Sequence, residues 1–366
     1  MARRSAPATS SPQLAAKMGQ RRSDRFLNAL RDADRVVFVS HVNPDPDSLG
    51  SMLGLAHLVE TKLGKPTILT RDGLISRAEN RAMVEVLHLN LCPVEDIVWR
   101  DGDAVVMVDS QPNTGRHSLD DEAPITAVLD HHDTPGDLED VPFSDIRPNL
   151  GATCTLVTKY LIEQDIPLTE KLATALTYGI ETEVSGFPRE AGPEDDRALE
   201  QLYPMSDKDL ISQIRNARLP HSHFECLLQA LQSSFIYDRL IISWVYELPQ
   251  PEQAAEVCDF MVRFDRVDWA VCAGVIDDSL ILSLRTTKPE CRAGDLLRKV
   301  VGDLGKAGGH DRRAGGMIRL SGTSQSAIEE LQSELRRRFL KVLKMDEDMR
   351  GQRLVPLREM LSNLQP

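Results

Sequence analysis

Four short apolar segments in the first third of the chain constrain the fold most. They are rich in β-branched residues and almost continuously apolar: 35–40 (RVVFVS), 66–70 (PTILT), 104–108 (AVVMV) and 125–129 (ITAVL). Strands that are buried on both faces of a parallel sheet have this composition. Helical patterns lie between and after them, at 48–62, 78–87, 152–163 and 169–180. The alternation predicts an α/β domain with a mainly parallel sheet flanked by helices.

The 366 residues are enough for two domains. A second strand-rich region is predicted at 240–246, 269–276 and 280–284, followed by a helix at 293–304, a glycine-rich loop at 305–316 and a charged helix at 324–344. The predicted organisation is a flexible tail at 1–22, a first domain at 23–190, a helical linker at 191–238, a smaller α/β domain at 239–345 and a tail at 346–366. A basic contact arm is the alternative for the first tail.

Charge and cysteine usage exclude several classes of protein. The formal net charge of −13 excludes a broadly basic protein that coats long nucleic acid, but not a local pocket for a short anionic substrate. No run approaches the ~18 apolar residues of a membrane span, and residues 1–22 lack the apolar stretch of a secretory signal. The six cysteines are widely spaced without a C-x-x-C pair, so we expect reduced thiols in a cytoplasmic protein.

Acidic residues and histidines follow three of the predicted strands and one helix. In chain order they are His41, Asp45, Asp47, Asp109, Asp130, His131, His132 and Glu183. Ligands of open α/β sheets bind at the carboxyl ends of the strands, and neighbouring carboxylates need a counter-charge, which a divalent cation provides. Mixed imidazole and carboxylate favour Mn, Fe, Zn or Co over Ca²⁺. Two metal ions that share a carboxylate are typical of phosphate-ester hydrolases.

Each of these residues also has a structural interpretation. An Asp at a strand end is often a helix N-cap, which is the alternative for Asp47, and Asp109 alone is equally compatible with a turn. Single histidines are more often structural than ligands, and we assign that role to His57, His88 and His117. The ordered combination of four segments is what favours a metal site over these separate explanations.

This combination resembles the DHH–DHHA1 phosphoesterase superfamily, which includes RecJ-type exonucleases, nanoRNase/pAp-phosphatases and cyclic-dinucleotide phosphodiesterases. The resemblance covers about 33–322. Its four motifs are similar to 41–50 (HVNPDPDSLG), 108–110 (VDS), the name-giving 130–132 (DHH) and 179–183 (GIETE). It implies an N-terminal DHH domain, a C-terminal DHHA1 domain and a catalytic cleft between them.

The resemblance also implies two divalent metal ions, usually Mn²⁺, with Mg²⁺ or Co²⁺ as alternatives. It implies six ligands: His41 and Asp45 for one ion, Asp47, His131 and Glu183 for the other, and Asp109 bridging both. Catalytic roles are implied for His132, which would contact the substrate phosphate, and for Asp130, which would orient a histidine. Glu183 stands where the family usually has Asp, a departure that bears on the affinity of the second metal site.

The glycine-rich segment 305–316 (GKAGGHDRRAGG) is the second cluster. Glycines allow a close approach of the backbone to a phosphate, although such a segment alone is equally typical of a plain turn. It resembles the GGGH substrate loop of DHHA1 domains, with Ala307 in place of the first glycine. The resemblance implies substrate binding by Gly308, Gly309, His310, Arg312 and Arg285. A surface salt bridge is the alternative for Arg285.

The sequence therefore predicts a two-metal phosphoesterase of the nanoRNase/pAp-phosphatase type that acts on short oligoribonucleotides, pAp or both. A cyclic-dinucleotide phosphodiesterase of the c-di-AMP type is the first alternative, because both substrates present a similar phosphodiester to the metal ions. The second is a nucleotide-binding regulator without turnover, motivated by Glu183, and a third is a purely structural α/β protein. The expected partner is a short oligonucleotide or nucleotide phosphate, with neither a membrane nor a long duplex; a homodimer is compatible.

Overall fold

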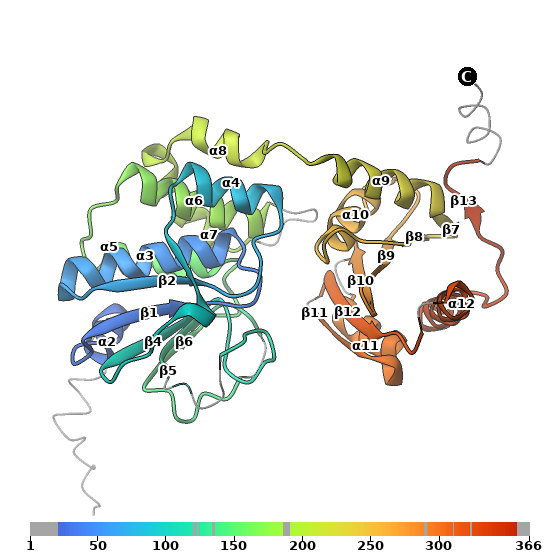
Figure 1. Cartoon of the computed structure of the whole chain (residues 1–366). Helices are drawn as coiled ribbons and strands as arrows, with labels where there is room; N and C mark the ends of the chain where they lie inside the picture. The colour runs from blue at the N-terminus through green and yellow to red at the C-terminus, as the bar shows by residue number, and fades with distance from the viewer. Residues whose placement is uncertain are drawn as a thin grey trace, which may run out of the picture. The chain divides into compact units, whose positions relative to one another are not determined.

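The computed structural model describes residues 21–119, 123, 125–133, 136–185, 191–288, 291–309, 311–322 and 324–356. The chain divides into two compact units, Met1–Ala217 and Arg218–Pro366, each with its own sheet (Figure 1). The division lies inside the segment 191–238, for which the sequence predicts a helical linker. Its helices α7 (Pro193–Leu202) and α8 (Lys208–Arg215) belong to the first unit, and α9 (His221–Ser233) belongs to the second.

The first unit contains a six-stranded, fully parallel sheet in the order β3-β2-β1-β4-β5-β6. Its strands are β1 (Arg35–Val39), β2 (Thr67–Arg71), β3 (Leu91–Pro93), β4 (Asp103–Val108), β5 (Ile125–Asp130) and β6 (Phe143–Ile146). The four predicted strands are the central ones, so the predicted parallel sheet is confirmed. The edge strands β3 and β6 were not predicted, since their sequences LCP and FSDI are short and not continuously apolar.

Alternate residues of the central strands enter two separate apolar cores. Val36, Phe38, Val106 and Val108 belong to one core, and Val37, Val39, Val105 and Met107 to the other. Both faces of the sheet are therefore buried, which explains the continuous apolar segments of the sequence. The first core is completed by helices; the second is completed by apolar residues of the 3-10 helix η1 (Val94–Asp96) and of connecting segments.

The helices of the first unit that position the site are α3 (Pro46–Leu63), α5 (Thr153–Glu163) and α6 (Glu170–Val184). The remaining helices before α7 are α2 (Arg22–Ala29) and α4 (Ala78–Val86). Two glycines let α3 and α6 approach each other closely. A Cβ at Gly179 would lie 2.8 Å from the carbonyl oxygen of Pro46, and one at Gly50 would lie 3.0 Å from that of Ala175. The first distance is shorter than real Cβ contacts and the second is tighter than nearly all of them, so a side chain at either position would push α3 and α6 apart.

The second unit has a seven-stranded mixed sheet in the order β11-β12-β10-β9-β8-β7-β13, in which only the β8–β9 pair is parallel among the described strands. The strands are β7 (Phe235–Tyr237), β8 (Leu240–Val245), β9 (Trp269–Ile276), β10 (Ser279–Thr286), β11 (Lys306–Gly309), β12 (Arg313–Arg319) and β13 (Gln352–Arg353). The helices are α9, α10 (Gln253–Met261), α11 (Ala293–Val301) and α12 (Gln325–Val342). The second unit therefore combines helices with a sheet, as the predicted C-terminal α/β domain requires.

Two predictions for the second unit are wrong in detail. The glycine-rich segment 305–316 is not a loop, because β11 and β12 pair antiparallel with Gly308 opposite Gly315. Gly294 of α11 packs against this hairpin so closely that a Cβ there would lie 2.2 Å from the carbonyl oxygen of Gly309. The predicted tail 346–366 begins too early, since β13 pairs with β7. Residues 1–20 and 357–366 lie outside the described part of the chain.

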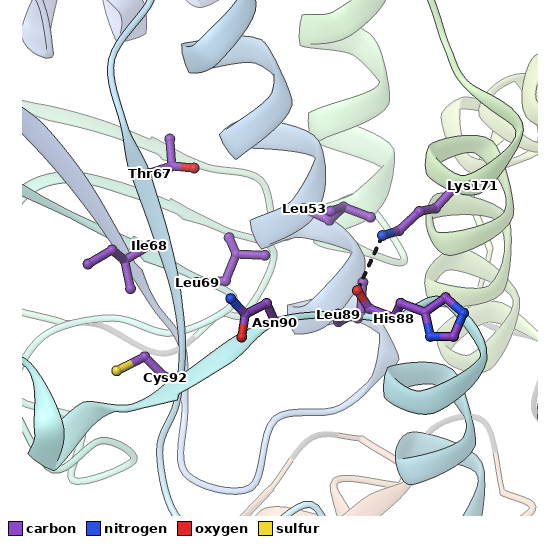
Figure 2. Close-up of a pocket in the computed structure, with 9 residues that line it drawn as sticks. All are labelled: Leu53, Thr67, Ile68, Leu69, His88, Leu89, Asn90, Cys92 and Lys171. Carbon is purple, nitrogen blue, oxygen red and sulfur yellow. Dashed lines mark hydrogen bonds between the residues drawn. The ribbon is translucent and has the colours of Figure 1, made fainter.

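The first unit also has a cavity of about 320 Å³. Figure 2 shows its lining, which comes from α3, β2, the segment around β3, and the start of α6, where the Lys171 ammonium donates to the carbonyl oxygen of His88 at 3.4 Å. None of the predicted site residues lines this cavity. Among the described helices, none combines the length and the apolar character needed to cross a bilayer.

Candidate metal centre

Asp109 lies directly after β4 and is the centre of the cluster. Its backbone adopts the left-handed conformation, with φ of 54°, and its side chain is buried (1% exposed). The Ser48 hydroxyl donates to Oδ2 at 2.7 Å, and the Thr153 hydroxyl donates to Oδ1 at 3.2 Å. Hydroxyls from α3 and α5 therefore fix the two carboxylate oxygens without neutralising their charge.

His41, Asp45 and Asp109 form the first group. Nε2 of His41 lies 3.4 Å from Oδ2 of Asp109 and 3.6 Å from Oδ2 of Asp45. Nδ1 of His41 is 2.8 Å from the carbonyl oxygen of Val42, so a proton on Nδ1 leaves Nε2 as the ligand atom. Burial alone would lower the pKa of His41, but hydrogen bonds to the two carboxylates raise it to about 10. Without a metal, a proton supplies the positive charge that this group requires.

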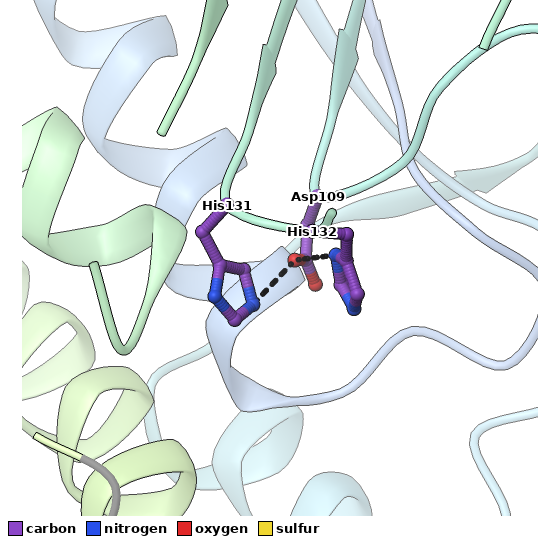
Figure 3. Close-up of side chains that lie close together, drawn as sticks. All are labelled: Asp109, His131 and His132. Atoms are coloured by element: carbon purple, nitrogen blue, oxygen red, sulfur yellow. Dashed lines mark ion pairs between the residues drawn. The ribbon is translucent and has the colours of Figure 1, made fainter. Parts of the chain in front are cut away.

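His131 and His132 approach Asp109 from the end of β5 and form the second group (Figure 3). Nε2 of His131 lies 3.6 Å and Nδ1 of His132 lies 3.5 Å from Oδ1 of Asp109. The carbonyl oxygen of Leu150 lies 3.2 Å from Nδ1 of His131. A backbone carbonyl thus directs Nε2 of His131 toward the cluster, as Val42 does for His41.

Asp130 orients His132. Its Oδ1 lies 2.7 Å from Nδ1 of His132, and its Oδ2 accepts a hydrogen bond of 2.8 Å from the side-chain amide of Gln111. Burial raises the pKa of Asp130, but the hydrogen bond and the charge of His132, together with the hydrogen bond from Gln111 and the charge of His131, outweigh burial, and the pKa falls to about 2. Sequence reasoning missed Gln111. The only signal for it is its position two residues after Asp109, in the turn that follows β4.

Asp47 is fully buried in the first turn of α3. The N–H groups of Thr153 and Cys154 each donate to one of its oxygens at 2.7 Å. The N-cap of α3 is Asp45, whose side chain accepts from the N–H of Ser48; the carboxylate of Asp47 instead binds the start of α5. Its Oδ2 also lies 3.8 Å from Nε2 of His131.

Glu183 lies in the last turn of α6, and not in a turn that follows a helix ending near 180 as predicted, because α6 continues to Val184. Its charge raises the pKa of His131, together with the larger influence of Asp109, against the lowering by burial. Its charge also adds to the effect of burial and of Asp109 and Asp45 in raising the pKa of Asp47. Glu183 is therefore electrostatically coupled to the second group.

The donor set fits divalent metal ions. Within each of the two groups, His41–Asp45–Asp109 and Asp109–His131–His132, one ligand atom per residue lies within 4.8 Å of the others. Both groups share Asp109, and both combine imidazole nitrogen with carboxylate oxygen, which is suited to Mn²⁺, Fe²⁺, Co²⁺ or Zn²⁺. Asp47 and Asp109 are almost completely excluded from water, and the charge of Asp109 adds to burial in raising the pKa of Asp47; buried carboxylates that repel each other favour a bound cation.

Two of the predicted substrate residues of the second unit, Arg285 and Arg312, lie around the end of β10. The N–H of Thr286 donates to the carbonyl oxygen of Arg312 at 3.1 Å, next to the β10–β12 ladder. Arg285 forms an ion pair of 2.5 Å with Asp259 and donates to the Ser283 hydroxyl at 3.1 Å. Arg285 therefore forms the salt bridge that the sequence predicts as the alternative to substrate binding, and its partner is Asp259. Gly308 and Gly309 lie in β11, and His310 lies outside the described residues.

Part of the chain matches a protein-family model, and two curated proteins are similar to it in sequence. Residues 35–180 match the family model described as DHH family, N-terminal domain. The uncharacterized protein MJ1633 of Methanocaldococcus jannaschii is 28% identical over 320 residues, which cover 86% of this chain and 65% of that protein. The probable manganese-dependent inorganic pyrophosphatase of Oceanobacillus iheyensis is 27% identical over 181 residues, which cover 49% of this chain and 57% of that protein. The chain thus spans less than two thirds of the length of both relatives.

The fold has a counterpart among solved structures. The crystal structure of an exopolyphosphatase-related protein from Bacteroides fragilis is similar with a TM-score of 0.65 and 18% sequence identity. The similarity covers 88% of this chain and 97% of that protein. At this identity the comparison shows that the fold is shared.

Proposed function

We propose that this chain, whose residues 35–180 match the DHH family N-terminal domain, is a metal-dependent phosphoesterase of the DHH superfamily that hydrolyses short oligoribonucleotides, pAp or both. The observation that carries the proposal is the position of Asp109, whose Oδ2 lies 3.4 Å from Nε2 of His41 and whose Oδ1 lies 3.6 Å from Nε2 of His131. A shared carboxylate is the arrangement of two-metal hydrolases of phosphate esters. Two divalent ions, with Mn²⁺ as the first choice, would be held by His41, Asp45, Asp47, Asp109, His131 and Glu183.

The metal ions supply the charge that activates water and neutralises the phosphate in the transition state. The chain's own residues prepare the site for them. Carbonyl oxygens hold Nδ1 of His41 and of His131, so both rings present Nε2 to the cluster. Asp130 holds Nδ1 of His132, which keeps this ring in one orientation; we propose that its other nitrogen binds the substrate phosphate.

For the second unit we propose that Arg285, Gly308, Gly309, His310 and Arg312 bind the remaining phosphates of the substrate. Support comes from the placement of Arg285 and the Arg312 backbone at the same end of the β10–β12 ladder. A guanidinium is suited to this task because it binds phosphate oxygens in a bidentate geometry. Its ion pair with Asp259 would hold the Arg285 side chain in place between substrates. No disulfide joins the six cysteines, all of which lie in the described part of the chain, in keeping with the cytoplasmic location that we propose.

The test is a hydrolysis assay in Mn²⁺ that resolves the products of pApA, pAp, cyclic di-AMP and inorganic pyrophosphate. We expect AMP from pApA or pAp, and at least a 10³-fold loss of rate in Asp109→Asn, which removes a ligand that both groups share. Asp96→Asn is the matched control, because Asp96 is an exposed acid of η1 outside the cluster. Its rate should equal that of the wild type.

Other outcomes would redirect the proposal. Turnover of cyclic di-AMP alone would identify a cyclic-dinucleotide phosphodiesterase, and turnover of pyrophosphate alone would identify an activity like that named for the Oceanobacillus relative. Binding of Mn²⁺ without turnover of any of the four substrates would contradict the proposed hydrolysis and favour the binding-only alternative.

A further inference from the structure

A buried carboxylate outside the predicted site, Asp195, reaches from α7 toward the metal centre. Asp195 has no exposed surface, and it lies beyond residues 35–180 of the family match. Its Oδ2 accepts a hydrogen bond of 2.7 Å from the N–H of Gly192, the N-cap of α7. This bond alone would make Asp195 an ordinary residue of a helix start.

Two further donors to Asp195 come from a different part of the chain. The N–H of Gly151 lies 3.1 and 3.0 Å from its two oxygens, and the Thr155 hydroxyl donates to Oδ1 at 2.6 Å. A buried carboxylate requires hydrogen bonds to its oxygens, and these N–H and O–H groups supply them. These donors therefore hold Asp195 and are in turn held by it.

Segment 150–155, which contains these two donors, also carries contacts of the metal centre. The carbonyl oxygen of Leu150 positions His131, and the N–H groups of Thr153 and Cys154 bind the two oxygens of Asp47. Asp195 holds this segment on both sides of Thr153 and Cys154. Gly151 and Thr155, which bind Asp195, therefore stand in the same six-residue segment as the groups that contact Asp47 and His131.

We infer that Asp195 is a positioning residue of the metal centre. It fixes the backbone of 150–155, and this backbone sets the orientation of Asp47 and His131. The inference deepens the proposed function and rests on it for the role of these two side chains as ligands. Partners that orient metal ligands typically change metal affinity by 10- to 100-fold when they are replaced, although they never contact the metal ion.

The test compares Asp195→Asn with Asp103→Asn in the full-length protein. Asp195→Asn keeps the shape of the side chain but replaces one carboxylate oxygen with an amide NH₂ group. This group cannot accept the hydrogen bonds that the oxygen receives from Gly151 and from Thr155 or Gly192. Asp103→Asn also removes a mostly buried carboxylate of the first unit, one that pairs with Arg35 at the start of β4, away from segment 150–155. We expect the Mn²⁺ dissociation constant, measured by electron paramagnetic resonance, to be about 10- to 100-fold larger in Asp195→Asn and unchanged in Asp103→Asn.

A second readout requires no metal. In the metal-free protein, hydrogen exchange of a peptide covering 150–156 should be at least tenfold faster in Asp195→Asn than in Asp103→Asn, once exchange is compared at equal global stability. Thr155→Val removes one donor to Asp195 and should produce a smaller effect in the same direction. Thr155→Ser keeps the hydroxyl and should restore the wild-type values of both readouts.

The outcomes separate this inference from the proposed function. Equal Mn²⁺ affinity and equal exchange in the two Asp→Asn variants would overturn the positioning role. If the wild type binds no Mn²⁺, the proposed function fails, and the exchange comparison alone then decides whether Asp195 holds the segment. Should Asp195→Asn fail to fold, the Thr155→Val and Thr155→Ser pair gives the same decision.

Discussion

Asp109 illustrates how a single residue combines backbone strain with function. A non-glycine residue in the left-handed region costs about 1 kcal/mol or more, and Asp tolerates it better than most. The φ of 54° turns the chain sharply after β4, and the carboxylate then lies within 3.6 Å of ring nitrogens of His41, His131 and His132. An outlier in this position agrees with the proposed role of Asp109 as the shared ligand.

Glu183 stands where the DHH family that the sequence resembles usually has Asp, and the replacement of Glu183 is the first prediction. Glu183→Gln removes the charge that acts on Asp47 and His131 but keeps the length of the side chain. We expect the weaker of two Mn²⁺ sites to lose about tenfold in affinity, while the stronger site is unchanged. The loss of one carboxylate ligand or its charge is the physical reason.

A titration of bound Mn²⁺ by electron paramagnetic resonance measures both affinities. Glu183→Asp provides the matched control, because it keeps the charge and shortens the side chain to the length that the family usually has. Equal affinities of Glu183→Gln and the wild type for both ions would exclude Glu183 as a ligand.

At the scale of the elements, one ion pair joins the starts of two neighbouring parallel strands. Arg35 of β1 and Asp103 of β4 are opposite each other in the sheet register, and their side chains approach to 2.5 Å. The hydrogen bond from Arg35 holds the pKa of Asp103 below its usual value. We expect Asp103→Asn to lower the free energy of unfolding by about 1–3 kcal/mol, the range for a lost hydrogen bond to a charged group.

The sign of the pH dependence follows from the lowered pKa. The contribution of Asp103 is fully present above its pKa in the unfolded chain, about 3.9, and is lost as the pH falls through the lower pKa of the folded protein. The difference between wild type and Asp103→Asn should therefore be constant at neutral pH and shrink in acid. Urea unfolding at a series of pH values measures it, and a difference that grows toward low pH would contradict the assignment.

The contact between α3 and α6 gives the third prediction. A Cβ at Gly179 would lie 2.6 Å from Sγ of Cys154 and 2.8 Å from the carbonyl oxygen of Pro46, at the start of α3. Gly179→Ala must therefore displace the start of α3, which carries Asp45 and Asp47. We expect a loss of about 1–3 kcal/mol in stability, the usual range for overpacking, together with weaker Mn²⁺ binding.

Thermal unfolding with and without Mn²⁺ measures both effects. Gly322→Ala is the control, since a Cβ at Gly322 would meet no atom within 4 Å, and it should leave stability and affinity unchanged. Unchanged Mn²⁺ binding in Gly179→Ala would show that the start of α3 does not set the ligand geometry.

A helix or strand can be predicted from the sequence when its own residues determine its structure, and not when residues far away in the sequence determine it. The central strands were predictable, because burial on both faces makes their sequences continuously apolar. The β11–β12 hairpin was not, because glycines have a low strand propensity and this hairpin depends on the close packing of Gly294. The hydrogen bonds from the N–H groups of Thr153 and Cys154 to Asp47 could not be predicted either, because more than 100 residues separate donor and acceptor in the sequence.

At the scale of the whole molecule, all six proposed metal ligands lie in the first unit, 1–217. The cores of the two units are formed by separate sets of residues. A ligand that binds only the native state stabilises it according to its concentration and affinity, by about 2.7 kcal/mol at one hundred times the dissociation constant. Stabilisation by Mn²⁺ should therefore concentrate in the unit that carries the ligands.

Hydrogen exchange of the full chain, followed by mass spectrometry, measures this distribution. We expect Mn²⁺ to slow exchange in peptides that contain the start of α3, the ends of β4 and β5, and the end of α6. Peptides from β8, β9 and β10 should exchange at the same rate with and without Mn²⁺, because they contain none of the proposed ligands. Mg²⁺ at the same concentration tests the choice of metal, since imidazole nitrogen favours Mn²⁺ over Mg²⁺. Protection that appears first in β8–β10 would place the Mn²⁺ ligands in the second unit and contradict the assignment to Asp109.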